Sequence, residues 1–321
     1  MPGHLILGAA LIACVCGLCP EAPAQEPGVA GSPKNSRLAF ISDTQTPLWL
    51  EALVLGGHRN VEATDTLLAH ILRTRPASLF MLGDLVSFGA YTGSWQTMEQ
   101  NILYMRKTQI PVHAILGNHE LMIYARTGES FFADMFPDHV RTGYCVSVDS
   151  VAVLLLNSNF DNLDEAEQQQ QQQWYTQTLD SLEQDPGTVS IVVCCHHSPF
   201  TNSTIVEASG PVRQMFVPPY IRTAKCLLFL SGHAHAFEHF REQGKDFMVI
   251  GGGGGSRHVL LTGAEEIWKD RAPDKKPLFH YLTVDRRGAS LRATVHGLRA
   301  DFHNVEETYV LDVPASQPIR N

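Results

Sequence analysis

Residues 78–84 read SLFMLGD, an apolar run of strand length that ends in a glycine and an acidic residue. Runs of the same kind recur along the chain, and most are apolar throughout: 37–41 (RLAFI), 112–116 (VHAIL), 151–156 (VAVLLL), 190–195 (SIVVCC), 226–230 (CLLFL) and 247–250 (FMVI). A strand that is buried on both faces has this composition. The runs therefore predict β-strands that are covered on both sides by other layers.

Helical patterns separate several of these runs. Residues 62–76 (EATDTLLAHILRTRP) carry an apolar stripe closed by a proline: Leu67, Leu68, Ile71, Leu72 and Pro76. A second helix is expected from Ser94 to about Lys107. A third, around the glutamine tract 168–173, is expected to have a solvated face, with Trp174 and Leu179 turned inward.

The order of these patterns predicts the fold class. Strands that alternate with helices indicate an α/β protein with a mixed or largely parallel sheet. Residues 280–313 show no helical pattern and are expected to finish a sheet as antiparallel strands.

The net charge of −9 comes with no long basic run, so the chain lacks the electrostatic features of a protein that binds long nucleic acids. Small anionic substrates stay possible, because bound divalent metals would reverse the local field. We expect a small-molecule partner; the sequence does not indicate an oligomeric state.

The amino-terminal end predicts export. Residues 1–24 resemble a signal peptide, with Ala22 and Ala24 at −3 and −1 of a cleavage site before Gln25. A flexible leader is expected over 25–36 and a tail over 316–321. The protein would then be periplasmic or secreted. The alternative is lipidation at Cys14, which follows Leu-Ile-Ala and would tether the protein to a membrane.

Polar side chains follow five of the apolar runs directly. They are Asp43, Asp84, the trio Asn118-His119-Glu120, the pair His196-His197, and His233 with His235. In α/β sheets, ligands bind beyond the carboxyl ends of the strands, so these groups can converge. Their oxygen and nitrogen donors suit manganese, iron, zinc or cobalt, and they exceed what one tetrahedral ion needs. Two divalent ions that share one carboxylate are the arrangement we expect.

Five motifs together resemble the signature blocks of the calcineurin-like metallophosphoesterase superfamily. They are SDTQ, GDLVS, GNHE, the HH of CCHHSP, and GHAH, in the order of that superfamily, and the resemblance runs from about Leu38 to about Val313. It implies a four-layer αββα sandwich over residues 37–315, with two central mixed β-sheets flanked by helices. It also implies hydrolysis of phosphomonoesters or phosphodiesters at a two-metal site.

The resemblance assigns roles residue by residue. One metal would be held by Asp43, Asp84 and His235, and the other by Asp84, Asn118, His196 and His233, so that Asp84 bridges the two. His119 would be the catalytic acid or a phosphate contact, and the amide of Asn118 would face the phosphate. The expected nucleophile is a hydroxide shared by the two ions.

The chain departs from the superfamily pattern at two positions. Gln45 stands where the first block commonly has histidine, and a neutral amide oxygen is a weaker ligand, so the metal beside Asp43 is expected to be held less tightly. Ser87 stands where purple acid phosphatases have a tyrosine ligand, which argues against that iron-tyrosinate subgroup. The Asp-Arg-Gly of serine/threonine protein phosphatases is also missing, which disfavours a phosphoprotein substrate.

The motifs support roles for other polar residues near the blocks less strongly. His197, Arg257 and His258 are candidate substrate contacts, the latter two at the rim, whereas Glu238 and His239 are expected to support the ligands from outside.

Two alternatives to a general phosphoesterase stay open. One is a nucleotide or cyclic-nucleotide phosphodiesterase; the other is a catalytically weakened binding protein of the same fold.

Overall fold

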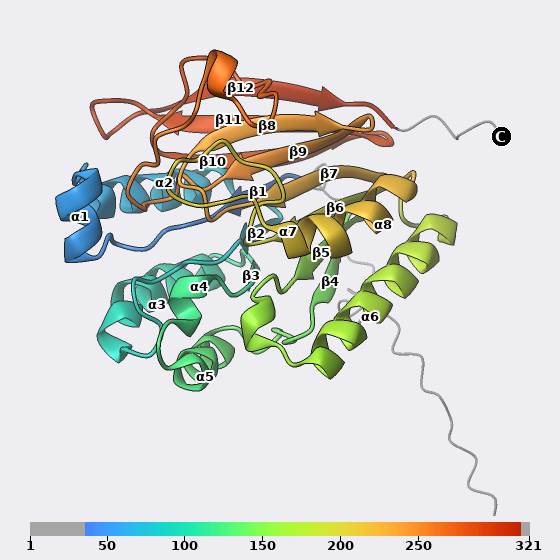
Figure 1. The fold of residues 1–321 in the computed structure, drawn as a ribbon, viewed down its shortest axis with the longest axis horizontal. Coiled ribbons are helices and arrows are strands. Elements are labelled where there is room, and N and C mark those ends of the chain that lie inside the picture. The colour runs from blue at the N-terminus through green and yellow to red at the C-terminus, as the bar shows by residue number, and fades with distance from the viewer. Residues whose placement is uncertain (1–35, 316–321) are drawn as a thin grey trace, which may run out of the picture.

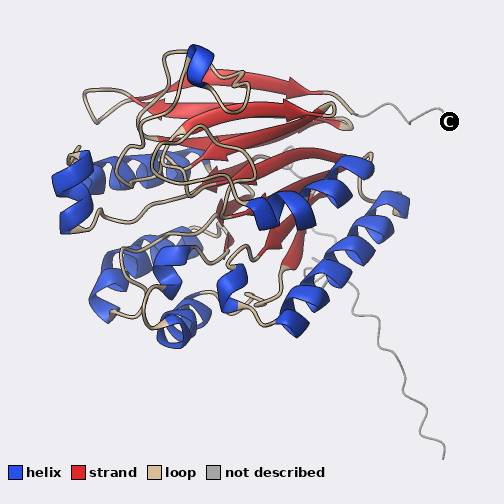
Figure 2. Cartoon of the chain, viewed as in Figure 1, coloured by secondary structure: helices blue, strands red, loops and turns tan. Residues whose placement is uncertain are grey.

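Two six-stranded mixed sheets and the helices outside them make up the computed structural model, which describes residues 36–315 (Figures 1 and 2). The α/β fold with two mixed sheets between helices is thereby confirmed. The expected signal peptide, Cys14, nearly all of the leader, and the tail lie outside the described residues. Within residues 36–315, no helix is both long and apolar enough to cross a membrane.

The first sheet combines parallel and antiparallel strands. Across the sheet they are β12 (Val305–Val313), β11 (Ser290–Leu298), β10 (His280–Arg287), β1 (Leu38–Ile41), β2 (Ser78–Met81) and β3 (Val112–Ala114). β1, β2 and β3 are parallel, and β10 is antiparallel to β1. β10, β11 and β12 form an antiparallel meander, which confirms the expectation for residues 280–313.

The second sheet has a parallel centre and two antiparallel edges. Its strands in order are β4 (Tyr144–Val148), β5 (Val151–Leu156), β6 (Ser190–Cys195), β7 (Cys226–Ser231), β9 (Lys245–Ile250) and β8 (Phe237–Glu242). β5, β6, β7 and β9 run parallel, so the loops that follow them leave the sheet on the same side.

The helices connect the strands and cover the outer faces of the sheets. They are α1 (Trp49–Leu55), α2 (Asn60–Thr74), α3 (Thr92–Lys107), α4 (Asn118–Leu121), α5 (Ala125–Met135), α6 (Glu165–Gln184), α7 (Gly210–Met215) and α8 (Val217–Arg222), with 3-10 turns η1 (Phe160–Asn162) and η2 (Gly263–Glu265). The helices expected around residues 62–76 and 94–107 are present as α2 and α3. In α2, Leu67, Leu68 and Ile71 are buried, and Leu72 is partly buried beside them.

The glutamine tract differs from its expected solvated face at one position. Gln171 is fully buried, and its amide bonds both backbone groups of Asn157: it accepts from the N–H at 2.8 Å and donates to the carbonyl at 2.9 Å. Leu179 is buried as expected, whereas Trp174 is only half-buried. Six consecutive identical residues carry no pattern that singles out the one facing inward.

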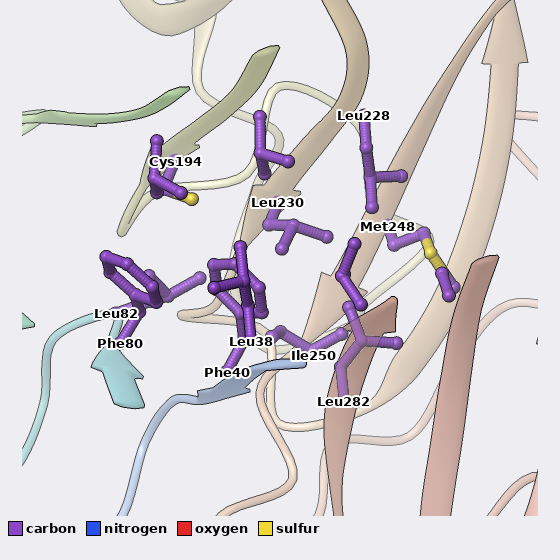
Figure 3. Packing of buried hydrophobic residues seen from close by; sticks show 14 of the residues in the cluster. Leu38, Phe40, Phe80, Leu82, Cys194, Leu228, Leu230, Met248, Ile250 and Leu282 are labelled. Carbon is purple, nitrogen blue, oxygen red and sulfur yellow. The ribbon is translucent and has the colours of Figure 1, made fainter. Parts of the chain in front are cut away.

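Three apolar cores separate the four layers. The central core lies between the sheets, where Phe40 and Phe80 stack with ring centroids 5.0 Å apart in a cluster that also contains Leu228 and Leu282 (Figure 3). A second core joins the first sheet to α2 and α3, and a third joins the other sheet to α6, α7 and α8. Because the central strands contribute to two cores, both of their faces are buried, which explains the continuous apolar runs.

His139 is half-buried, and both of its ring nitrogens are enclosed without a hydrogen-bond partner. His139 follows α5, its ring meets Phe132 edge-on with centroids 4.9 Å apart, and neither ring nitrogen has a partner. Burial and the charge of Arg141 lower the pKa of His139 to about 4. The native state therefore keeps this ring neutral where the unfolded chain, with an ordinary pKa of about 6.5, already binds a proton.

We expect this difference to make the protein acid-sensitive. Stability from neutral His139 is complete above pH ~6.5 and is lost as pH falls towards 4, by up to about 1.4 kcal/mol per pH unit. Between pH 7 and pH 5, His139→Phe should therefore gain about 1.5–2 kcal/mol relative to the wild type in urea unfolding of metal-free protein. His303→Phe, at an exposed position, is the control. An equal difference between wild type and His139→Phe at both pH values would contradict this account.

Candidate metal centre

The loops that follow five strands meet where the two sheets adjoin. Asp43 follows β1, Asp84 follows β2, Asn118 opens α4 after β3, His196 follows β6, and His233 and His235 follow β7. Backbone hydrogen bonds tie these loops to one another. The N–H of Asp43 donates to Gly83, that of Gly232 donates to His196, and that of Gly255 donates to Asp43. Residues from distant parts of the chain thus form one cluster.

Three residues of the cluster have left-handed backbone conformations. Asp43, Asp84 and His233 have φ values of 59°, 52° and 66°. Such conformations cost about 1–3 kcal/mol each and persist where the surrounding structure enforces them. Here the backbone N–H of His233 donates to both carboxylate oxygens of Asp43 (3.1 and 3.0 Å), and the N–H of His119 donates to Asp84 Oδ1 (2.8 Å). The strained backbone and the two carboxylates therefore stabilise each other.

The first donor group consists of Asp43, Asp84 and His235, whose ligand atoms all lie within 4.8 Å of one another. His235 Nδ1 donates to the carbonyl of Ser256 at 2.7 Å. The lone pair of a neutral His235 ring is therefore on Nε2, which lies 3.4 Å from Asp43 Oδ1. Burial lowers the pKa of His235, but its hydrogen bond with Asp43 and the charge of that carboxylate outweigh burial and raise it.

The second donor group consists of His196, His197 and His233. It adjoins Asp84 and Asn118 through His196. His196 Nδ1 donates to the carbonyl of Leu82 at 2.8 Å, and Nε2 lies 3.1 Å from Asn118 Oδ1 and 3.2 Å from Asp84 Oδ2. Burial lowers the pKa of His196, but the charge and hydrogen bond of Asp84, the charge of Asp43 and the Leu82 carbonyl together outweigh burial and raise that pKa to about 9. Ring nitrogens of His196, His197 and His233 also lie within 4.8 Å of one another.

Gln45 lies beside the first donor group. It is 1% exposed, and its hydrogen bonds are satisfied when Nε2 donates to the backbone carbonyls of Asp43 (3.2 Å) and Asp84 (2.9 Å). Oε1 then lies 3.2 Å from His235 Nε2. Two atoms with lone pairs that face each other at this distance suit neighbouring ligands of one cation. The position is therefore compatible with the expected role of Gln45 as a ligand.

His119 lies beside the donor groups, and its ring is held from one side. Nδ1 donates to the carbonyl of Ser87 at 2.9 Å, which leaves Nε2 3.9 Å from Asp84 Oδ2 and 3.8 Å from Glu51 Oε1. Burial lowers the pKa of His119, but Asp84, the Ser87 carbonyl and Glu51 together raise it above its ordinary value. Raising that pKa favours a ring that can donate a proton from Nε2. Ser87 itself donates its hydroxyl to Thr46, so it supports a loop.

Glu120 supports the site in a way that the sequence analysis missed. Its fully buried carboxylate accepts from the N–H groups of Asp84 (2.9 Å), Leu85 (2.7 Å), Val86 (3.2 Å) and Gly117 (2.7 Å). Burial and the charge of Asp84 raise the pKa of Glu120 to about 7, whereas these N–H donors lower it. Its place at the third position of α4, where a glutamate caps a helix, was the signal available in the sequence.

The segment after β5 was also missed. Ser158 Oγ accepts from the backbone N–H of His197 and lies 2.9 Å from its Nδ1, and Asn159 donates to the carbonyl of Leu116. Asn157 is in turn held by Gln171. Residues 151–159 read VAVLLLNSN, so the same pattern of an apolar run followed by polar residues was present here.

The three candidate substrate contacts, His197, Arg257 and His258, differ in how deeply they are buried. Arg257 is exposed, and His197 is half-buried at the second donor group. The rim position expected for His258 is wrong: it is 4% exposed, stacks on His235 with centroids 4.4 Å apart, and its Nδ1 accepts from the backbone N–H of His235. It orients a candidate ligand from behind.

Glu238 and His239 were expected to support the ligands from outside. Glu238 anchors Thr201 and Asn202, and the next residue, Ser203, lies 3.1 Å from His258. Glu238 therefore supports His235 through several contacts. His239 does not: it bonds Asp246 and Tyr309, and so links the β8 and β12 edges of the two sheets.

Five consecutive glycines, residues 251–255, provide room for close packing beside the first donor group. A Cβ atom on Gly251 would lie 2.1 Å from the carbonyl oxygen of Ala234, and one on Gly255 would lie 2.4 Å from the His235 ring. Neither position accepts a side chain without displacement of its neighbours. The run therefore lets the backbone approach His235.

The residues present fit two divalent cations. Asp43 and Asp84 are buried carboxylates, and the histidine rings whose Nδ1 atoms are bound to backbone carbonyls present unprotonated Nε2 atoms when neutral. A carboxylate, amide and imidazole set suits transition metals, and no thiolate is involved. Asn118, His197 and His233 are only half-buried, so the second donor group is the more open one.

Replacing Gln45 tests whether its oxygen faces a metal. Gln45→Glu keeps the shape, adds charge and removes the donor to two backbone carbonyls. We expect tighter binding of one divalent ion in calorimetric titration, together with a loss of at least about 1–3 kcal/mol in the unfolding free energy of metal-free protein. Gln45→Ala should lower both the metal affinity and the unfolding free energy of the metal-free protein. Unchanged metal affinity in Gln45→Glu would show that Oε1 does not face a metal.

Replacing Glu120 tests its support of Asp84. In Glu120→Gln, an NH₂ group replaces one acceptor oxygen opposite N–H donors, so we expect a loss of about 2–4 kcal/mol in chemical unfolding. Metal content measured by elemental analysis should also fall, because Asp84 loses its anchored loop. Glu99→Gln, on the exposed face of α3, is the control. Full stability and metal content in Glu120→Gln would contradict this role.

The fold resembles that of several solved structures. A purple acid phosphatase from yellow lupin (Lupinus luteus) superposes with a TM-score of 0.60 at 14% identity, covering 85% of this chain and 53% of that chain, so this chain spans about half of the lupin enzyme. GAP50 of Plasmodium, described as an anchor in the inner membrane complex, gives 0.60 at 12% identity, covering 88% and 89%. A dimetal phosphatase from Danio rerio gives 0.55 at 14% identity, covering 87% and 99%.

Sequence comparison identifies the family directly. No curated protein matches the chain. The family profile described as calcineurin-like phosphoesterase matches residues 36–237, which contain the two donor groups and His119. β10, β11 and β12 lie beyond that match and complete the first sheet next to β1. The chain belongs to the calcineurin-like phosphoesterase family.

Proposed function

We propose that the protein hydrolyses small phosphoesters with two divalent metal ions bound at the junction of its sheets. One observation carries this proposal: the two donor groups adjoin at Asp84, with His119 beside them. The proposed ligands are Asp43, Gln45, Asp84 and His235 for one ion and Asp84, Asn118, His196 and His233 for the other. Manganese, iron, zinc and cobalt suit this set.

The bound ions would supply Lewis acidity, neutralising phosphoryl oxygens and lowering the pKa of a water molecule. The protein's own side chains orient the phosphoryl group and donate hydrogen bonds or a proton. The amide of Asn118 orients a phosphoryl oxygen, and His119 Nε2 donates a proton to the leaving-group oxygen or a hydrogen bond to the phosphoryl group. Ser87 supports this role because its carbonyl fixes the His119 ring with Nε2 turned towards Asp84.

Two other functions are ranked below this one. A nucleotide or cyclic-nucleotide phosphodiesterase would use the same ligands, so monoester and diester substrates must be compared directly. A binding protein without turnover would resemble GAP50 in its described role as an anchor. The retained donor set and His119 support hydrolysis over simple binding.

We also infer that the protein acts outside the cytoplasm. The signal-like residues 1–24 support export into a periplasm or to the outside, with lipidation at Cys14 as the alternative route. Net charge −9 supports a small substrate rather than a long nucleic acid.

The test is a metal-dependent assay on 4-nitrophenyl phosphate and bis(4-nitrophenyl) phosphate. Metal-free protein should be inactive, and manganese, zinc, iron or cobalt should restore hydrolysis of at least one ester. His119→Ala should keep both metals and lose about 10²–10⁴ of turnover. Full turnover by protein shown to be metal-free by elemental analysis would refute the proposal. The ratio of the hydrolysis rates of the two esters then distinguishes a monoesterase from a diesterase.

A further inference from the structure

Three histidine rings meet at the second donor group, whereas the ligands proposed for the second ion include only His196 and His233. The centroid of the His197 ring lies 4.4 Å from that of His233 and 4.9 Å from that of His196. One ring nitrogen of each histidine lies within 4.8 Å of the other two. A cation that accepts lone pairs from all three rings fits such a group, because neutral imidazole is a common metal ligand.

The hydrogen bonds of His197 decide which ring nitrogen has the lone pair. Ser158 Oγ accepts from the backbone N–H of His197 at 2.9 Å and lies 2.9 Å from its Nδ1. The Cys195 thiol donates to the His197 carbonyl at 3.1 Å, and the Ser158 hydroxyl has a hydrogen bond with the Cys195 side chain. With its hydrogen directed to that sulfur, Oγ accepts from Nδ1 as well. The lone pair of a neutral His197 ring is therefore on Nε2.

His197 thus has the same arrangement as the histidines that are proposed as ligands. Nδ1 donates to a backbone carbonyl at 2.8 Å in His196 and at 2.7 Å in His235, and to a hydroxyl oxygen in His197. In proteins, a histidine that binds a metal usually donates its other ring N–H to an oxygen in this way. The hydrogen bonds of His197 are therefore those of a ligand.

The segment that carries Ser158 is itself held on both sides. Gln171 bonds both backbone groups of Asn157, and Asn159 Nδ2 donates to the carbonyl of Leu116 at 3.0 Å. Ser158 is 4% exposed. The Ser158 hydroxyl is therefore fixed by the fold, and it fixes the His197 ring before any ligand binds.

We propose that His197 is a third imidazole ligand of the second metal ion, together with His196 and His233, and that this ion is zinc or cobalt in preference to manganese. The inference rests on the proposed function, because it takes an ion to bind at the second donor group. It adds one residue to the ligands of that ion and gives the ion a chemical identity.

The preference for zinc or cobalt follows from a difference between the two ligand sets. The first ion would have three oxygen donors and one imidazole. The second would have three imidazoles beside the oxygens of Asp84 and Asn118. Imidazole suits zinc, and zinc and cobalt bind a given nitrogen and oxygen set more tightly than manganese, whereas carboxylate and carbonyl oxygens also suit manganese. The first equivalent of zinc should therefore bind at the second donor group.

Calorimetric titration of metal-free protein with zinc measures the contribution of His197. His197→Phe keeps an aromatic ring against His233 but has no lone pair, so the affinity of the tighter zinc site should fall at least about tenfold. Manganese binding at the first donor group should stay unchanged. His70→Phe is the matched control, at a half-buried position that contacts Tyr281 and His296. Full zinc affinity in His197→Phe would refute the proposal.

Ser158→Ala tests the orientation of the ring. The variant keeps His197 but removes the oxygen that accepts from Nδ1, so zinc affinity should fall about tenfold. Ser147→Ala, at an exposed position on β4, is the control. An unchanged zinc affinity in Ser158→Ala would contradict the assignment of the lone pair to Nε2.

A crystal structure of the wild type with one equivalent of zinc tests the ligand without any variant. The anomalous signal of zinc should lie about 2.0–2.1 Å from His197 Nε2, as for other histidine ligands of zinc. Zinc at the first donor group, or zinc bound by His196 and His233 without His197, would overturn the proposal.

The two proposals fail separately. Zinc bound by His197 in a protein that hydrolyses no phosphoester with any metal would refute the proposed function and keep the ligand. Metal-dependent hydrolysis by a protein whose zinc is not bound by His197 would do the reverse.

Discussion

The burial of two carboxylates side by side is the constraint on which the rest of this structure depends. Asp43 and Asp84 are 0% and 1% exposed, and a buried charge is stable only where donors or cations replace the lost water. Backbone N–H groups of His233 and His119 supply part of this compensation, and the histidine rings and the proposed metals supply the remainder. Left-handed backbone at both aspartates is tolerated because the same contacts hold it in place.

The surrounding fold provides the rigidity that this arrangement needs. In each sheet, the loops that follow the parallel strands leave on the same side. The central apolar core fixes the position of the two sheets relative to each other. Glu120 joins the loops after β2 and β3 by accepting from four N–H groups, so one side chain positions both Asp84 and the start of α4. On the other sheet, His258 and Ser256 orient His235 from behind. The candidate ligands are thus held by hydrogen bonds from residues around them.

Much of this organisation could be predicted from local patterns. Runs such as SLFMLGD and SIVVCC are strands because they are apolar throughout, and the polar residues after them converge because parallel strands share a carboxyl edge. The same pattern is present at Asn157–Asn159, but this segment contains no histidine or carboxylate that would indicate a place beside a metal site. Gln171 could not be distinguished from its five identical neighbours, because the helical phase of α6 relative to the second sheet is set by packing.

The sequence by itself determined the identity of the strands, the family and the set of candidate ligands, because these depend on residue type and order along the chain. Only the tertiary structure decided which histidine nitrogen faces the cluster, since that depends on carbonyls from distant segments, such as Leu82 for His196 and Ser256 for His235. It also decided that His258 lies behind a ligand instead of at the rim, and that Glu51 reaches His119 across 68 positions of sequence. Such contacts join residues far apart in the chain, and their geometry exists only once both sheets have packed.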